Sequence, residues 1–399
     1  MADYKIIDKE KYYRKGVFRH FSEDCKCSTS MTSRIDVTRL AAVSKQTGTK
    51  FYINFLYILT KVLNSREDYR MAYLWETGEL ICYDVINPIQ YVFHEDTETC
   101  TPVYTTYCED YRTFYEGALK DIGNAKATRE YMLDSASHPN WFDASYISWL
   151  SYDSFNIELP DGYLYFPPIV NWGKYKREGG RLVMPVSVRL NHAIADGFHV
   201  ANVFRLLQKE MGSFCDEHCT LYTDRLILRR VTENDIPDIY EAARDPEVGP
   251  RCGWPPHKNI GESEFVVRNV LKGDQCYCIA LKENNKAIGI IEIKLFGTGR
   301  SEASSEDECE LGFWLGRSYW GNGYMPEAGR EMIRHAFEDL DMKKIYCGHI
   351  EENAQSARVQ EKLGFRFLRR TENMYRPLMD DHKTDIMNVL TRSEWESDS

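Results

Sequence analysis

The stretch Asn191–Gly197, Asn-His-Ala-Ile-Ala-Asp-Gly, places a histidine, an aspartate four residues later and a glycine at the end of an apolar run. That run, residues 182–190, predicts a strand, and the apolar spacing of residues 198–211 predicts a helix, with the glycine at the turn between them. A histidine at a strand end can take a proton from a hydroxyl group near neutral pH. An aspartate beside it can hold an arginine and so fix the local backbone. Because this spacing also arises by chance, the motif alone does not establish a catalytic site.

Further motifs surround this stretch over most of the first ~215 residues, a span that fits one domain. In chain order they are Tyr12–Lys15, Thr32–Asp36, Lys50–Tyr52, Val92–His94, Thr97–Thr99, Asp153–Asn156, Pro167–Ile169 and Pro185–Val200. Together they closely resemble the chloramphenicol acetyltransferases. The resemblance implies a two-layer α/β (α+β) sandwich that transfers an acetyl group from acetyl-CoA to a hydroxyl group. It also implies a homotrimer, with each active site formed between neighbouring subunits.

The resemblance assigns roles to five residues of the first half. His192 corresponds to the general base, and Ser145 falls on the serine that donates a hydrogen bond to the developing oxyanion. Asp196 and Arg14 match an ion pair that orients the loop carrying the histidine. His199 also fits the family pattern, on the first turn of a helix, and is expected to be structural.

The cofactor and acceptor positions of the first half are also implied by the resemblance. Lys50 and Lys174 match positions near the CoA phosphates, although each could instead be a solvated surface lysine. Four positions of the acceptor pocket differ in size or polarity from those of relatives that use chloramphenicol, and they are Thr29, Tyr91, Cys100 and Ile157. Four simultaneous changes could redirect the choice of acceptor, so we expect the catalytic groups to be retained and the acceptor not necessarily to be chloramphenicol.

The second half contains a glycine turn between a predicted strand and a predicted helix. The strand is Glu310–Leu315, the turn carries Gly321 and Gly323, and the helix spans about residues 326–340. Such a turn lets backbone N–H groups approach a pyrophosphate, and the helix N-terminus favours the negative charge. The segment Asn353–Phe365 then reads as an N-capped helix closed by a glycine.

These two segments, with the alternating Leu221–Arg229 and the loop Trp254–His257, strongly resemble the GNAT superfamily, and in particular its RimJ/RimL-like N-acetyltransferases. The resemblance covers about residues 221–392. It implies a mixed twisted sheet with flanking helices, in which acetyl-CoA lies where two central strands splay apart. The family often has Gln or Arg three residues before the first turn glycine; this chain has Ser318 there, and the adjacent Arg317 is the expected substitute.

In this second half the resemblance implies transfer of an acetyl group to a primary amine. Glu310 matches a frequent position of the general base, and Ser356 matches a position that protonates the departing thiolate. The acidic run of residues 302–310 could attract a cationic acceptor or could be a solvated loop. The residues expected at acetyl-CoA are Arg317, Gly321, Gly323, Tyr324 and Asn353, the last of which also suits a helix cap.

Length and charge bound the remaining possibilities. The chain has 399 residues and a formal net charge of −11. The length predicts two domains, at residues 1–215 and 221–399, joined by a linker at residues 216–220. The negative charge argues against a general nucleic-acid surface. The most apolar stretch, residues 51–63, is too short to span a bilayer and predicts a buried helix instead.

The twelve cysteines are scattered without a framework, and their spacing matches no zinc site. They indicate free thiols in a reducing cytoplasm, and no signal-peptide core precedes the first motif. The sequence therefore predicts a cytoplasmic bifunctional acyltransferase that uses acetyl-CoA and no metal, acting on an antibiotic-like hydroxyl compound, for which chloramphenicol is one candidate, and on a primary amine. The alternative is that one domain is catalytic and the other serves assembly or CoA binding.

Overall fold

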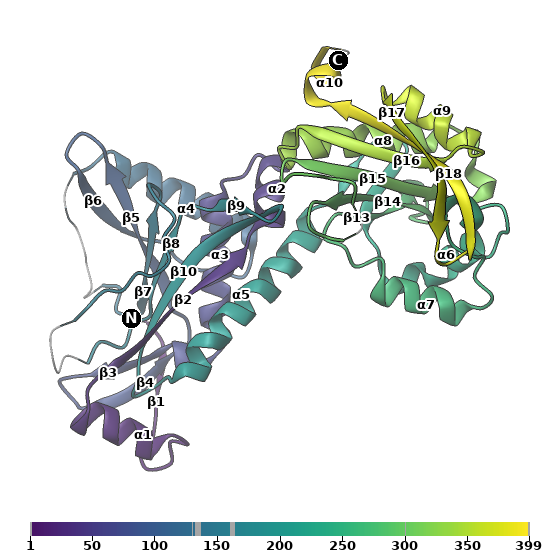
Figure 1. Cartoon of the computed structure of the whole chain (residues 1–399). Coiled ribbons are helices and arrows are strands. Elements are labelled where there is room, and N and C mark those ends of the chain that lie inside the picture. Colours follow the sequence, from purple (N-terminus) through teal and green to yellow (C-terminus); the bar gives the residue numbers. More distant parts are fainter. Residues whose placement is uncertain (1, 130, 132–136, 160–163, 300, 398–399) are drawn as a thin grey trace. The chain divides into compact units, whose positions relative to one another are not determined.

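The computed structural model describes residues 2–129, 131, 137–159, 164–299 and 301–397. The chain forms two compact units, each with its own sheets and helices (Figure 1). The first unit comprises Met1–Leu40, Gly48–Lys176 and Leu182–Phe214, and the second comprises Ala41–Thr47, Arg177–Arg181 and Cys215–Ser399.

The first unit is built on a seven-stranded sheet of order β2-β10-β8-β7-β5-β6, with β9 paired to β10, and a smaller sheet of order β1-β4-β3. The strands of the large sheet are β2 (Ser28–Asp36), β5 (Asn87–His94), β6 (Thr99–Tyr104), β7 (Trp141–Ile147), β8 (Ile169–Gly173), β9 (Lys176–Glu178) and β10 (Arg181–Asn191). The strands of the small sheet are β1 (Tyr4–Ile6), β3 (Met71–Leu74) and β4 (Glu79–Tyr83).

The helices of this part of the chain are α1 (Lys15–Arg19), α2 (Thr38–Gln46), α3 (Phe51–Asn64), α4 (Tyr111–Lys126) and α5 (Gly197–His218), with short helices at His20–Asp24 and Glu67–Tyr69. Helix α3 is the buried helix that the apolar stretch predicts. Helices α3 and α4 contact β5, and α4 also contacts β6. The Gln90 side chain of β5 donates to Thr105, which donates to Asp121 of α4. One face of the sheet is therefore covered by these helices.

The opposite face of β5 and β7 is less enclosed. Phe142 and Ala144 of β7 are fully buried, whereas Asp143 and Ser145, which alternate with them, are only half-buried. Since Ala144 pairs with Gln90, the half-buried residues point away from α4. A single copy of the chain thus leaves this face of the sheet partly open.

The second unit is built on an eight-stranded sheet of order β11-β12-β13-β14-β15-β16-β18-β17, in which β15 and β16 are parallel. Its strands are β11 (Leu221–Tyr222), β12 (Leu226–Arg230), β13 (Cys276–Leu281), β14 (Ala287–Leu295), β15 (Glu308–Leu315), β16 (Lys344–Ile350), β17 (Arg366–Arg376) and β18 (Asp381–Thr391). Its helices are α6 (Ile236–Ala243), α7 (Ile260–Asn269), α8 (Tyr324–Arg334), α9 (Ala354–Lys362) and α10 (Arg392–Ser397), with short helices at Glu233–Asp235, Gly249–Cys252, Arg317–Tyr319 and His335–Asp339.

The mixed α/β class expected from the sequence is confirmed, but element boundaries differ in two places. Helix α5 does not end near Met211: it continues to His218, through part of the expected linker, because the buried Phe214 and Cys215 extend its apolar side. The expected strand at residues 221–229 is instead two short antiparallel strands joined by a turn. Across the described residues, no helix has the length and apolar character needed to cross a membrane.

Candidate active sites

His192 lies directly after β10, where its N–H donates to the carbonyl of Cys27 at 3.0 Å. Its ring stacks on Phe21 with centroids 3.9 Å apart and planes 8° from parallel. The ring is half-buried, and its Nδ1 has no hydrogen-bond partner among the described residues. The imidazole is thus held flat by stacking at the end of a central strand, an arrangement suited to accepting a proton.

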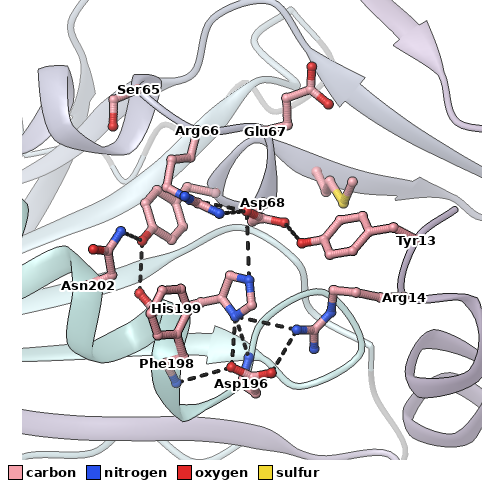
Figure 2. Close-up of polar contacts among 12 residues, drawn as sticks. Tyr13, Arg14, Ser65, Arg66, Glu67, Asp68, Asp196, Phe198, His199 and Asn202 are labelled. Carbon is pink, nitrogen blue, oxygen red and sulfur yellow. Dashed lines mark hydrogen bonds and ion pairs between the residues drawn. The ribbon is translucent and has the colours of Figure 1, made fainter.

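The loop that carries His192 is anchored by an ion pair and a histidine (Figure 2). Asp196 accepts hydrogen bonds from Arg14 at 2.8 Å and from the Phe198 N–H at 3.1 Å, and its carboxylate lies 2.8 Å from His199 Nδ1. Burial alone would raise the pKa of Asp196, but the bonds to Arg14 and His199 outweigh it and hold that pKa well below its ordinary value. The predicted Arg14–Asp196 pair is therefore present in the structure.

Behind this pair, Asp68 provides an anchor that the sequence did not reveal. Its carboxylate accepts from the Tyr13 hydroxyl at 2.7 Å and from Arg66 at 2.6 Å, and it lies 3.8 Å from His199 Nε2 (Figure 2). Tyr69 in turn donates to the His199 carbonyl at 2.8 Å. No spacing in the sequence links residues 13, 68 and 199, so only the folded chain brings this group together.

Ser145 lies on β7, on the partly open face of the sheet. Tyr91 lies on the neighbouring strand β5, and its phenol donates a hydrogen bond to the Asp143 carboxylate at 2.7 Å. Tyr165 donates to the other oxygen of Asp143 at 2.5 Å. Burial raises the pKa of the Asp143 carboxyl, against the bonds from Tyr165 and Tyr91, which favour its ionised form. Asp143, two residues before Ser145 on the same face, is a polar group that sequence reasoning did not single out.

The structure does not bring His192 and Ser145 together within one chain. Ser145 pairs with Asn171 of β8, which pairs with Ser187 of β10, and His192 lies five residues beyond Ser187. Two strand spacings of about 4.8 Å and five residues of about 3.3 Å put the two Cα atoms about 19 Å apart. A general base and an oxyanion donor must reach groups only a few ångströms apart, so these two cannot serve one reaction from the same copy.

The remaining predicted positions of the first unit are spread over the sheet. Thr29 lies on β2 and Cys100 on β6, which are opposite edges, and Ile157 is 38 % exposed. Lys50 precedes α3 and Lys174 follows β8. The residues after these lysines, Phe51 and Tyr175, have ring centroids 5.1 Å apart, so the structure brings the two lysine positions into one neighbourhood.

In the second unit, β15 and β16 separate, as the resemblance to the GNAT superfamily implies. Their parallel ladder ends at the pair Glu310–Tyr346, after which β15 stays with β14 and β16 stays with β18. The space between them opens into a cavity of about 600 Å³. Residues 310–315 and residues 347–349 line it from the two strands.

The glycine turn closes one end of this cavity. Gly321 and Gly323 have φ values of +78° and +79°, a region that favours glycine, and α8 begins at Tyr324. All three residues line the cavity. Since the first N–H groups of a helix have no acceptor within the helix, this turn suits an anionic group such as a pyrophosphate.

Two carboxylates lie on one face of β15, but only Glu310 lines the cavity. Its oxygens accept from Lys294 at 2.7 Å and from the Glu302 N–H at 2.9 Å. Burial would raise the pKa of Glu308, but bonds from Ser304 and Lys344 lower it to about 2. Glu308 is therefore a buried structural carboxylate, whereas Glu310 is placed to contact a ligand.

The other predicted site residues of the second unit also differ in whether they line the cavity. Ser356 and Asn353 line the cavity; the Asn353 side chain accepts from the Ser356 N–H at 3.2 Å and so caps α9, and Gln360 donates to Ser356 Oγ at 3.1 Å. Arg317 has a mostly exposed side chain 3.9 Å from Asp245 and is not among the residues that line the cavity.

Among the cavity residues that the sequence analysis did not single out are Arg251, Glu292 and His349, because nothing in their spacing marks them. Arg251 lies over the Trp320 ring at 5.6 Å, at the glycine-turn end of the cavity. Glu292 lines the cavity from β14, and His349 lines it from β16. Burial lowers the pKa of His349.

Comparison with known proteins finds a different family match in each half of the chain. The chloramphenicol acetyltransferase family model matches residues 2–208, and the acetyltransferase (GNAT) domain model matches residues 225–366. A chloramphenicol acetyltransferase of Proteus mirabilis is 35% identical over 219 residues, covering 54% of this chain and 95% of that protein. One of Campylobacter coli is 37% identical over 203 residues, covering 51% of this chain and 95% of that protein.

Solved structures similar to the chain fall into the same two groups. A chloramphenicol acetyltransferase has a TM-score of 0.47 at 22% identity, covering 52% of this chain and 100% of that one. A putative ribosomal-protein-serine acetyltransferase from Vibrio cholerae has a TM-score of 0.36 at 20% identity, covering 43% of this chain and 97% of that one. From the family matches and the curated relatives, the chain belongs to the chloramphenicol acetyltransferase family, and a GNAT acetyltransferase domain follows in the same acetyl-CoA-dependent transferase.

Proposed function

We propose that the first domain transfers acetyl groups to a hydroxyl group of a small molecule, at sites shared between copies of the chain. The observation that carries this proposal is the strand register, which puts His192 two strands and five residues away from Ser145, about 19 Å by ordinary sheet dimensions. Ser145 lies on a partly open face, which a neighbouring copy can cover with its own His192. A homotrimer of the kind implied by the family provides three such sites.

In this site His192 takes the proton of the acceptor hydroxyl as its oxygen attacks the thioester carbonyl. Ser145 of the neighbouring copy donates a hydrogen bond to the carbonyl oxygen as negative charge develops on it. When the carbon–sulfur bond breaks, His192 returns the proton to the sulfur, so an ester and CoA leave. Arg14 and Asp196 hold the loop, while Lys50 and Lys174 attract the CoA phosphates.

The second domain, we infer, acetylates a primary amine in the cavity between β15 and β16. Glu310 takes a proton from the amine, and Ser356 donates one to the departing sulfur. Gly321, Gly323 and Tyr324 place backbone N–H groups against the pyrophosphate of acetyl-CoA, a role that the positive φ values of the glycines support. Neither half of the proposal requires a metal ion.

The test is CoA release from acetyl-CoA with a panel of alcohols, chloramphenicol among them, and a panel of primary amines. We expect His192→Ala to abolish release with alcohols and to spare release with amines. The double variant Gly321→Val/Gly323→Val should do the reverse, so each variant is the control for the other. If His192→Ala leaves all alcohol-dependent release intact, the assigned base is wrong.

The alternative, in which one domain only assembles the protein or binds CoA, makes a different prediction in the same experiment. One of the two variants would then alter no turnover with any acceptor, although it would still bind or assemble. The ion pair of Arg14 and Asp196 beneath His192 favours a catalytic first domain, because a scaffold does not need an oriented imidazole.

A further inference from the structure

The acceptor-facing side of the first domain carries a half-buried carboxyl group, that of Asp143, beside the proposed oxyanion donor. Asp143 and Ser145 alternate with buried residues on β7, so both point to the partly open face. Their Cα atoms are about 7 Å apart along the strand. A molecule whose reacting hydroxyl lies near Ser145 therefore passes Asp143 as well.

The partners of Asp143 leave its negative charge without a counter-ion. In the part of the chain that the structure describes, its oxygens take part in only two polar contacts, with the hydroxyls of Tyr91 and Tyr165. Each carboxylate oxygen can accept two hydrogen bonds, so one site on each oxygen remains. A half-buried carboxylate that neutral phenols alone support is costly to keep charged. Burial accordingly raises its pKa, and a cationic ligand would offset that cost.

Arg189 of β10 is another charged group on this face. It pairs with Ile169 of β8, and Ile169 also pairs with Asp143, so Arg189 and Asp143 lie two strands apart, about 10 Å between Cα atoms. They form no ion pair, and Arg189 Nη1 is buried without a partner among the described residues. The guanidinium therefore does not neutralise Asp143, but it could select an anionic acceptor, which a test must distinguish.

Building on the proposed hydroxyl acetylation, we propose that Asp143 binds a positively charged nitrogen of the acceptor. The substrate class is then an amino alcohol whose ammonium group lies about 5–7 Å from the reacting hydroxyl, the spacing between Ser145 and Asp143. Tyr91 and Tyr165 fix the carboxylate so that its remaining acceptor sites face the ligand. This assigns to the acceptor pocket a charge preference that none of its apolar positions would create.

The test uses three hydroxyl probes of matched length: 4-aminobutan-1-ol, the neutral pentan-1-ol and the anionic 4-hydroxybutanoate. Ester formation is measured by mass spectrometry in the full chain carrying Gly321→Val/Gly323→Val, so that amide formation by the second domain does not interfere. We expect kcat/KM to be highest for the amino alcohol. Asp143→Asn should lower that value about 10–100-fold, the range for a lost charge-assisted hydrogen bond, with a small change for pentan-1-ol.

Asp121→Asn is the matched control. Asp121 is also a half-buried carboxyl with a pKa raised by burial and a hydroxyl donor, Thr105, but it lies on α4 on the covered side of the sheet. This variant should leave the order of the three probes unchanged. If Asp143→Asn does not fold, the order of the kcat/KM values of the three probes in the protein with an unaltered acceptor site still decides whether that site prefers a cationic acceptor.

Three outcomes would overturn the proposal. Equal loss with all three probes in Asp143→Asn would make Asp143 structural while leaving hydroxyl acetylation intact. A preference for 4-hydroxybutanoate would assign the selection to Arg189 instead. Absence of ester with all three probes, and with chloramphenicol assayed beside them, would overturn the proposed function itself, and the charge preference with it.

Discussion

Two inactive variants of the first domain should restore each other when they are mixed. If His192 of one copy and Ser145 of the next form each site, His192→Ala and Ser145→Ala damage different halves of it. A mixed oligomer then contains some interfaces with both intact residues. Within a single chain the two Cα atoms are about 19 Å apart, so no single copy of the chain can bring both groups to one site.

The magnitude follows from random assembly. An interface is intact when the first copy keeps its histidine and the second keeps its serine, each with probability one half in an equal mixture. About 25% of the sites should therefore be active, whether the oligomer is a dimer or a cyclic trimer. Each variant alone should lose about 10²–10³-fold or more in kcat, as for removal of a general base or an oxyanion donor.

The assay is co-expression of the two variants in equal amounts with one shared tag, so that all randomly assembled oligomers are purified together, followed by measurement of alcohol-dependent CoA release. A mixture of His192→Ala with His192→Gln is the control, because both lesions lie in the same half of the site and cannot complement. Recovery of about a quarter of the unmodified rate supports the shared site. If the rate of the mixture is only the sum of the rates of the two single variants, His192 and Ser145 do not share a site across copies, and the interpretation of their separation of about 19 Å is refuted.

Three further predictions concern individual side chains. Glu310→Gln should reduce amine-dependent kcat about 10²–10⁴-fold in steady-state assays without changing alcohol-dependent release, and an unchanged amine rate would exclude it as the base. Asp196→Asn leaves the buried Arg14 guanidinium without its counter-charge; because the Asp196 side chain is 41% exposed and therefore screened by solvent, the change should cost about 1–2 kcal/mol in urea unfolding, and a loss near zero would contradict a structural ion pair. Burial would raise the pKa of Glu308, but its bonds from Ser304 and Lys344 lower that pKa from the ordinary 4.5 to about 2 in the folded protein. Its ionised form therefore stabilises the fold above pH 4.5, and this contribution disappears as the pH falls through 2. Glu308→Gln should therefore flatten the melting temperature over that pH range, and parallel curves for both proteins would argue against the Lys344 pairing.

The local motifs were predictable because each depends on neighbours in the sequence. The turn after β10, the positive-φ glycines before α8 and the Asn353 cap of α9 all follow from the conformational preferences of a few adjacent residues. The length of α5 was underestimated because Gly212 suggested an end. The burial of Phe214, a tertiary effect, carries the helix onward.

The two carboxylates of β15 show where sequence reasoning stops. Alternation correctly puts Glu308 and Glu310 on the same face of the strand. It does not say that Ser304 and Lys344 hold the first away from the cavity while the second lines it. That distinction depends on the parallel ladder with β16, whose residues lie more than thirty positions away in the chain.

By itself the sequence determined the two families, the strand–turn–helix units and the identity of the candidate base, since short motifs encode local backbone geometry and side-chain chemistry. Tertiary structure alone decided that Ser145 lies far from His192 within one chain, that Asp143 meets Tyr91 and Tyr165, and that Glu310 rather than Glu308 lines the cavity. The physical reason is that strand order and register join residues distant in the chain, and no local preference specifies which strands become neighbours.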